Sequence, residues 1–252
     1  MKDMRKIKIY VVGGVFTAVC LCLAVLAILV WNGVILLNQT AARRYPVRGV
    51  DVSSWQGDID WTALAAQDLS FAFVKATEGS SFVDSCFAYN YIEAQKAGLR
   101  VGAYHFFSFD SAGETQADHF MQTVQPYDGM LPPVVDIEFY GQYEQNPPAQ
   151  AQVRTQLHVL LQKLTAYYGI RPVLYATEEA YALYISGGYT EYEIWIRNVV
   201  TTPNLPDGRE WTFWQYTNRG RLEGYSGAED YIDLNVFCGS KEAFARYARE
   251  MT

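Results

Sequence analysis

The chain opens with a long apolar run that differs in pattern from everything after it. Residues 9–37 are apolar with little interruption beyond Thr17 and Asn32. As an α-helix rising about 1.5 Å per residue, this run would extend about 43 Å, more than the roughly 30 Å hydrocarbon core of a bilayer. The pattern predicts one N-terminal transmembrane helix (residues 9–37), preceded by a short N-terminus (residues 1–8) and followed by a linker (residues 38–47).

Two interpretations of this run remain open. A secretory signal has a shorter apolar run of about 7–15 residues, which favours an uncleaved anchor. The small residues Thr40, Ala41 and Ala42 leave cleavage and secretion possible. Basic residues precede and follow the run, so charge favours a cytoplasmic N-terminus only weakly.

After residue 47, short apolar runs alternate with amphipathic segments. Strands are predicted at residues 48–53, 71–77, 99–108, 131–139, 171–177, 193–199, 210–217 and 231–238. Helical patterns occupy residues 61–67, 84–97, 114–124, 149–168, 178–185 and 241–251. Strands separated by helices are typical of a parallel sheet, and eight strands in about 200 residues favour a closed barrel.

The later connections depart from this alternation. Residues 200–209 are rich in Pro and Gly, and residues 218–230 show no apolar periodicity. The prediction for residues 48–252 is therefore an α/β fold, an irregular (β/α) barrel of eight strands. Its last three connections are short and helix-poor, and its last three strands pair partly antiparallel.

Charge is distributed unevenly between the two parts. Residues 1–44 carry six basic residues and one acid, whereas the rest carries 14 basic and 26 acidic residues. A domain with a net charge of -12 lacks the basic footprint that nucleic-acid binding needs, so no nucleic-acid partner is expected. Half of the chain is apolar or aromatic, which excludes a disordered protein.

Acidic residues fall where the barrel strands should end. In a parallel barrel the C-terminal strand ends form the active site, and Asp51, Asp136, Glu138 and Asp233 would converge there. Asp136 and Glu138 are two positions apart in one strand, so both point to the same side with Cα atoms about 6.5–7 Å apart. Two close carboxylates raise each other's pKa, so one can act as a general acid while the other stays anionic. Glycosidic bond cleavage requires this division.

A metal site is the alternative interpretation of the acidic pair. Of the three histidines, only His105 falls in a predicted barrel strand. His-x-x-x-His and Cys-x-x-Cys spacings are absent from the sequence, as is a Gly-rich phosphate loop. No metal and no cofactor is therefore expected. Cys86 and Cys238 could form a disulfide or remain free thiols.

Aromatic side chains accompany the acids. Tyr104, Tyr175, Trp195, Trp214 and Tyr216 lie in or at the end of predicted strands. Most aromatic residues must be core, but rings beside carboxylates are also suitable platforms for the apolar faces of sugars.

Six short motifs resemble the glycoside hydrolase family 25 lysozymes. They are Gly49–Gly57 (GVDVSSWQG), Phe73–Gly79 (FVKATEG), Val101–Phe106 (VGAYHF), Asp136–Glu138 (DIE), Trp214–Thr217 (WQYT) and Ile232–Asn235 (IDLN). They occur in the family's order between residues 48 and 237. One departure is Arg197 after Trp195-Ile196, where the family usually has alanine followed by an aromatic residue.

The resemblance implies N-acetylmuramidase activity: hydrolysis of the β-1,4 bond between N-acetylmuramic acid and N-acetylglucosamine in peptidoglycan. Glu138 matches the proton donor, Asp136 the second carboxylate, and Asp51 and Asp233 two further acids of the groove. The expected substrate-binding residues are Tyr104, Glu78, Tyr175, Trp195 and Gln215. The implied partner is the peptidoglycan glycan strand, which would place the barrel outside a bacterial cell membrane that residues 9–37 cross once. Protein partners are unknown.

Three questions stay open at this stage. Asp136 could orient the substrate's own acetamido group, act as nucleophile or activate water; its closeness to the acid favours the first. A non-catalytic peptidoglycan-binding scaffold on the same fold is the alternative function, which the four intact acids disfavour. Hydrolysis of chitin-like oligosaccharides is a third option.

Overall fold

The chain folds into two compact units, and the division falls between Leu37 and Asn38. The computed structural model describes residues 2–247. The first unit is built on helix α1 (Lys2–Trp31), in which Val12–Trp31 have a mean hydropathy of 2.7. By length and composition this segment could cross a membrane, a test that a signal sequence also passes. The helix ends six residues before the predicted end, just before Gly33, whose φ of 64° is left-handed.

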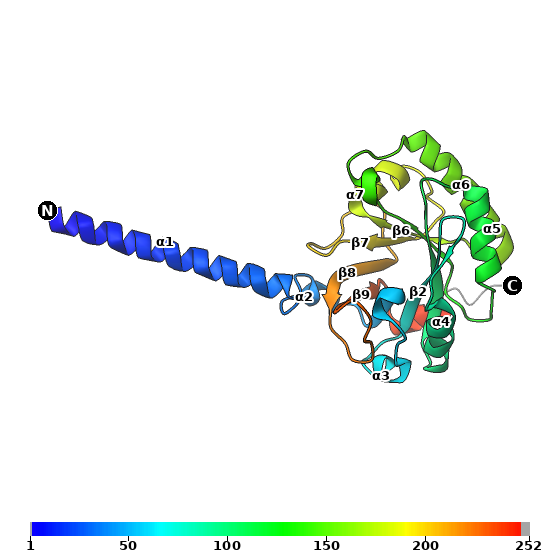
Figure 1. The fold of residues 1–252 in the computed structure, drawn as a ribbon, viewed down its shortest axis with the longest axis horizontal. Coiled ribbons are helices and arrows are strands. Elements are labelled where there is room, and N and C mark those ends of the chain that lie inside the picture. The colour runs from blue at the N-terminus through cyan, green and yellow to red at the C-terminus, as the bar shows by residue number, and fades with distance from the viewer. Residues whose placement is uncertain (1, 248–252) are drawn as a thin grey trace. The chain divides into compact units, whose positions relative to one another are not determined.

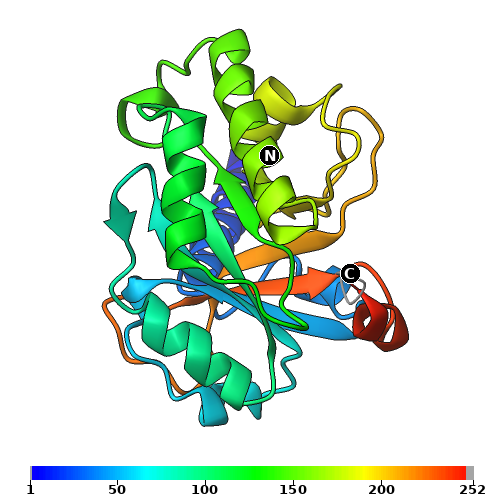
Figure 2. The same ribbon diagram turned by 90° about the vertical axis from the view of Figure 1, so that its right-hand side faces the viewer.

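Eight strands of the second unit close into a barrel (Figures 1 and 2). They are β1 (Val47–Val52), β2 (Phe71–Glu78), β4 (Arg100–Phe106), β5 (Val134–Ile137), β6 (Val173–Thr177), β7 (Ile194–Arg197), β8 (Phe213–Gly220) and β9 (Ile232–Phe237). Closure is direct, because β1 pairs with both β2 and β9. A short additional strand that the sequence did not predict, β3 (Phe82–Val83), pairs antiparallel with the end of β2.

The barrel is mixed, as predicted, but only one strand is reversed. Strands β1 to β8, apart from β3, run parallel to their barrel neighbours, and β9 runs antiparallel to both β8 and β1. The prediction of partly antiparallel pairing therefore applies to β9, and β7 and β8 remain parallel. The reversal has a consequence for the site, because the N-terminal end of β9 lies beside the C-terminal ends of the parallel strands.

Helices follow most of the parallel strands, and one more helix, α8, follows the reversed strand β9. They are α3 (Trp61–Ala65), α4 (Phe87–Lys96), α5 (Gly113–Thr123), α6 (Gln150–Tyr168), α7 (Glu178–Ala180) and α8 (Lys241–Arg246), with single turns η1 (Ser54–Gln56), η2 (Gly141–Glu144) and η3 (Tyr181–Ile185). Helix α4 begins three residues later than predicted, since the Asp84 carboxylate accepts the backbone N–H of Cys86 and holds a turn there. Residues 248–251 of the predicted last helix lie outside the described residues.

Rings fill the barrel interior where neighbouring strands supply glycine. Gly49 on β1 pairs with Phe71, and Gly102 on β4 pairs with Phe73. A Cβ at either glycine would lie 2.4 and 2.5 Å, respectively, from the ring opposite. Trp195 stacks on Phe73 with ring centroids 4.6 Å apart, and this layer closes the barrel below the site.

Residues 38–47 are folded against the barrel. They contain helix α2 (Gln39–Ala42), which the sequence did not predict within its linker. The buried Asn38 amide donates to the carbonyl oxygens of Asn198 and Tyr216 at 2.9 and 3.3 Å. Tyr45 packs edge-on against Trp214, with ring centroids 6.4 Å apart. This segment thus covers the outer face of β8. Within the described connection between β7 and β8, no helix covers that face.

The cysteines of the barrel unit are free. Cys86 is half-buried and Cys238 is exposed, and neither is in a disulfide. Of the two alternatives left open by the sequence, the structure has free thiols.

Candidate active site

Four carboxylates meet at one end of the barrel. Asp51 lies on β1, Asp136 on β5, and Glu138 immediately follows β5. Asp233 lies near the start of the reversed strand β9 and pairs in register with Asp51. Because β9 is antiparallel, the N-terminal end of this strand places its acid at the C-terminal end of the others.

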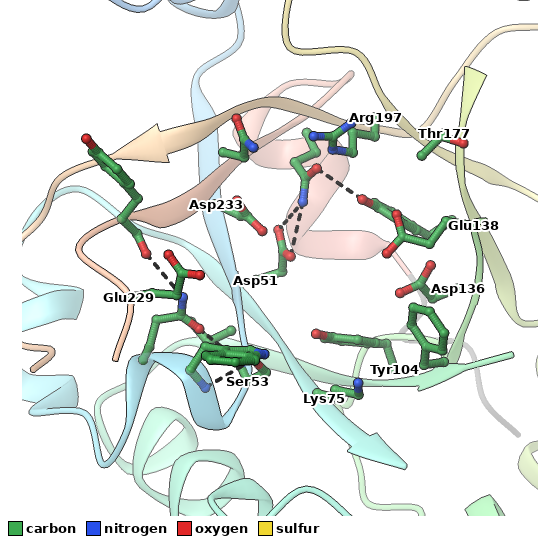
Figure 3. Close-up of a pocket in the computed structure, with 18 of the residues that line it drawn as sticks. Asp51, Ser53, Lys75, Tyr104, Asp136, Glu138, Thr177, Arg197, Glu229 and Asp233 are labelled. Carbon is green, nitrogen blue, oxygen red and sulfur yellow. Dashed lines mark hydrogen bonds between the residues drawn. The ribbon is translucent and has the colours of Figure 1, made fainter. Parts of the chain in front are cut away.

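These acids line an open pocket of about 550 Å³ (Figure 3). Its wall is formed by Asp51, Val52, Ser53, Trp55, Gln56, Lys75, Tyr104, Phe106, Asp136, Glu138, Phe139, Tyr175, Thr177, Arg197, Gln215, Asn218, Glu229, Tyr231 and Asp233. A deeper recess of about 80 Å³ is bounded by the four acids with Tyr104, Tyr175 and Trp195. Figure 3 shows Asp51 and Asp233 on one side, Asp136 and Glu138 on the other, and Tyr104 below.

Asp51 is fixed by amide side chains. The Gln215 amide donates to both of its carboxylate oxygens at 3.0 and 3.1 Å, and Asn235 donates to one of them at 2.6 Å. These amides are held in turn, since Tyr175 donates its hydroxyl to Gln215 and Trp195 its indole N–H to Asn235. Burial raises the pKa of Asp51, and these hydrogen bonds partly offset the rise.

The pKa of the neighbouring Asp233 is affected differently from that of Asp51. Burial, followed by the charge of Asp51, raises the pKa of Asp233 well above its usual range. The side-chain hydrogen bond between the two acids lowers the pKa of Asp51 and raises that of Asp233. The interaction between the two acids therefore favours the proton on Asp233 rather than on Asp51.

Asp136 and Glu138 form the second pair. Burial raises the pKa of both, and the Glu138 charge raises that of Asp136 further. Asp136 is only 6% exposed, and among the described residues its buried Oδ1 has no hydrogen-bond partner. An unpaired buried oxygen of this kind costs free energy unless a ligand supplies a donor.

Two cations lie beside these acids. Arg197 and Lys75 both lower the pKa of Glu138, so they limit the rise caused by burial. The Lys75 ammonium is 2.9 Å from the Glu78 carboxylate and lies over the ring of Phe106. Glu78 itself is half-exposed and lines neither the pocket nor the recess.

The other predicted substrate-binding residues lie at the site. Tyr104, Tyr175 and Gln215 line the pocket. Trp195 is only 2% exposed; it borders the deeper recess but does not line the larger pocket. Burial raises the pKa of Tyr104 and Tyr175 well above 10, so both hydroxyls stay neutral and able to donate.

His105 lies away from this chemistry. Its ring contacts the Thr77 hydroxyl at 2.7 Å and the Gln116 side-chain oxygen at 3.0 Å, in the buried layer between β4 and α5. Burial lowers the pKa of His105 to about 4, so the imidazole is neutral and its role is structural. Among the described residues, no group of three or more His, Cys, Asp or Glu side chains could hold a metal ion.

Several lining residues were not predicted from the sequence. Trp55 is 61% exposed at the rim of the pocket; it lies in the Gly49–Gly57 motif, but no individual role was predicted for it. Asn218 lies on β8, just beyond the predicted end of that strand, whereas Glu229 and Tyr231 lie in the loop before β9 and reach the pocket through the path of that loop. Arg197 was recognisable from the sequence as a charge at the active-site end of an apolar strand, but no role was assigned to it.

A mixed eight-stranded barrel with paired carboxylates at its C-terminal end defines a glycoside hydrolase type of site. The family model for the glycosyl hydrolases family 25 matches residues 50–225. The chain therefore belongs to this lysozyme-like family, as its motifs indicated.

Individual relatives agree with this assignment. A solved structure of a family 25 glycosyl hydrolase from Bacillus anthracis is 56% identical, has a TM-score of 0.78, and aligns with 81% of this chain and 94% of that one. Lysozyme M1 of Streptomyces globisporus is 35% identical, over 77% of this chain and 68% of its own. The uncharacterized protein YegX of Escherichia coli O157:H7 is 36% identical, over 79% and 72%.

Proposed function

We propose that this chain is a muramidase, which hydrolyses the β-1,4 bond between N-acetylmuramic acid and N-acetylglucosamine in peptidoglycan. The observation that carries the proposal is the Asp136–Glu138 pair beside the recess. Both acids have raised pKa values, and one Asp136 oxygen lacks a partner. The similarity to Lysozyme M1 supports the same activity.

Glu138 is the proton donor in this proposal. It transfers its proton to the glycosidic oxygen as the bond from that oxygen to the anomeric carbon breaks, and it later removes a proton from the attacking water. Its raised pKa suits this task, because the carboxyl stays protonated above the usual range of glutamate. The charges of Arg197 and Lys75 act against the rise in the pKa of Glu138 and favour release of the proton.

Asp136 orients the substrate's 2-acetamido group. The N–H of that group donates to the unpaired Oδ1, and the acetamido oxygen attacks the anomeric carbon as the leaving group departs. The same hydrogen bond stabilises the ionised form of Asp136, so the proton shared by the pair resides on Glu138 when substrate binds. A glycosyl ester on Asp136, trapped and detected by mass spectrometry, would show direct nucleophilic attack instead.

Activity of the purified chain tests the proposal. The full chain in detergent micelles should solubilise dye-labelled peptidoglycan, and Glu138→Gln should reduce the rate by about 10²–10⁴-fold, the usual contribution of a general acid. Glu210→Gln changes an exposed glutamate outside the pocket and serves as the matched control. Binding without solubilisation by the unmodified chain would favour the scaffold function.

We also propose that residues 9–37 hold the enzyme in a membrane, with residues 1–8 in the cytoplasm and the barrel outside. The apolar segment Val12–Trp31 supports this placement. The substrate supports the orientation, since peptidoglycan lies outside the membrane. Secretion after cleavage of the segment is the alternative.

A further inference from the structure

A second pocket opens beside the catalytic pocket and shares part of its wall. This side pocket has a volume of about 450 Å³ and lies at the C-terminal ends of β6 and β7. Phe139, Thr177 and Arg197 line both pockets. The side pocket therefore adjoins the catalytic pocket, and a substituent on a sugar bound there lies within reach of it.

Arg197 stands at the junction of the two pockets with its charge unpaired. Within residues 2–247 its guanidinium takes part in no ion pair, although it lowers the pKa of Asp51, Glu138 and Asp233 from a distance. Figure 3 places it at the edge of the pocket, close to Glu138. A guanidinium offers five N–H donors in a fixed fork, which suits a carboxylate or carbonyl oxygen of a ligand.

Another part of the side-pocket wall carries negative charge, opposite in sign to Arg197, and is held in place by hydrogen bonds. Asn198 donates its amide to the Glu178 carboxylate at 2.8 Å and to the Thr201 hydroxyl at 2.9 Å. Its side-chain oxygen accepts the backbone N–H groups of Val200 and Thr201, which fixes the loop. Glu178 and Glu179 line the side pocket but not the catalytic pocket, and Glu178 is held by this hydrogen-bonded loop.

We propose that the side pocket binds the peptide stem of peptidoglycan, with Arg197 receiving a stem carboxylate or carbonyl and Glu178 and Glu179 receiving a free stem amine. The inference rests on the proposed muramidase function. Muramic acid is one of the two sugars at the scissile bond, and its lactyl group carries the stem. Along such a stem, a residue that bears a carboxylate precedes the diamino residue. The charges of the protein follow a matching order, because Arg197 lines both pockets whereas Glu178 and Glu179 line only the side pocket.

Hydrolysis of matched substrates tests this inference. The full chain in micelles should show a lower KM for stem-bearing glycan than for glycan whose stems an amidase has removed. Acetylating the stem amine should raise KM about threefold to tenfold, the range expected for one or two partly exposed ion pairs. The double variant Glu178→Gln/Glu179→Gln should show the same rise with free-amine stems and no further rise on acetylation. Glu210→Gln should retain the wild-type ratios.

Cosedimentation of the full chain with the same three glycans provides a readout that does not depend on hydrolysis. Tighter binding to free-amine stems than to acetylated or removed stems, lost in the double variant, supports the inference. Equal KM and equal binding for all three glycans would overturn it, even if every glycan is cleaved and the muramidase proposal stands. Absence of cleavage with stem-dependent binding would instead contradict only the muramidase proposal.

Discussion

Asn235 holds two groups of the site at once. Its amide donates to Asp51 at 2.6 Å, and its oxygen accepts the Trp195 indole N–H at 2.8 Å. Asn235→Ala should destabilise the fold by about 1–3 kcal/mol, because it leaves a buried donor and a buried carboxylate short of a partner. It should also lower kcat, since Asp51 is no longer fixed.

Urea denaturation measures the first effect and peptidoglycan hydrolysis the second. The exposed residue Asn204 provides the control variant Asn204→Ala. An Asn235→Ala protein as stable and as active as this control would show that the amide network is dispensable.

The buried Asp136 carboxyl should lower the free energy of unfolding at neutral pH. Folding raises its pKa, so the folded state holds a proton more tightly than the unfolded state. Stability is therefore lost as pH rises above about 4, where the unfolded carboxyl ionises. Asp136→Asn should raise the melting temperature by about 2–6 °C at pH 7 and by less at pH 4, while hydrolysis is lost.

Calorimetry at the two pH values distinguishes removal of the ionising carboxyl from a pH-independent gain in stability. Asp128→Asn, at an exposed position, is the control. A gain of the same size at pH 4 and pH 7 would contradict the assigned cause, because it would not depend on ionisation.

At the scale of elements, residues 38–47 behave as part of the barrel wall. Asn38 and Ala42 are buried, and Trp214 and Tyr216 beneath this segment are at most 2% exposed. A chain beginning at residue 48 should therefore melt several degrees lower than one beginning at Asn38, because these rings become exposed. Equal melting temperatures in a thermal scan would show that the segment adds nothing.

The sequence predicted the elements whose pattern is local. Strand and helix periodicity predicted all eight barrel strands, and helix α6 ends at Tyr168 as predicted, before the left-handed Gly169. Helix α2 was missed because four residues carry no periodicity, and its position depends on hydrogen bonds to residues about 160 and 178 positions away. Strand β3 was missed for the same reason, since two residues show no alternation.

The candidate site was predictable where acids interrupt apolar strands. Asp51, Asp136, Glu138 and Asp233 are visible as charges that need a partner or a function. Glu229 and Tyr231 were not, because only the path of the loop between β8 and β9 brings them to the pocket. Nor could the sequence show that Glu78 is paired with Lys75 and lies outside the pocket wall.

For the whole molecule, the proposed anchor makes the apolar N-terminal helix the element that sets where the barrel works. Val12–Trp31 is long enough to span a bilayer. We expect the full chain to remain with membranes after carbonate extraction and to keep its N-terminus, as determined by intact mass. A Leu23→Arg/Val25→Arg variant should be released, because two charges near the centre of the span oppose insertion.

The matched control is Leu23→Ala/Val25→Ala, which keeps the segment apolar. A soluble wild-type protein that lacks its first residues would contradict the anchor and identify the segment as a signal sequence.

We propose that Glu138 protonates the glycosidic oxygen on the reducing side of muramic acid. The most direct measurement is mass spectrometry of the new reducing ends released from purified peptidoglycan by the full chain, beside Glu138→Gln. We expect muramic acid at the reducing ends, with at least a hundredfold less product from the variant. Glucosamine at the reducing ends, or undiminished product from Glu138→Gln, would contradict it.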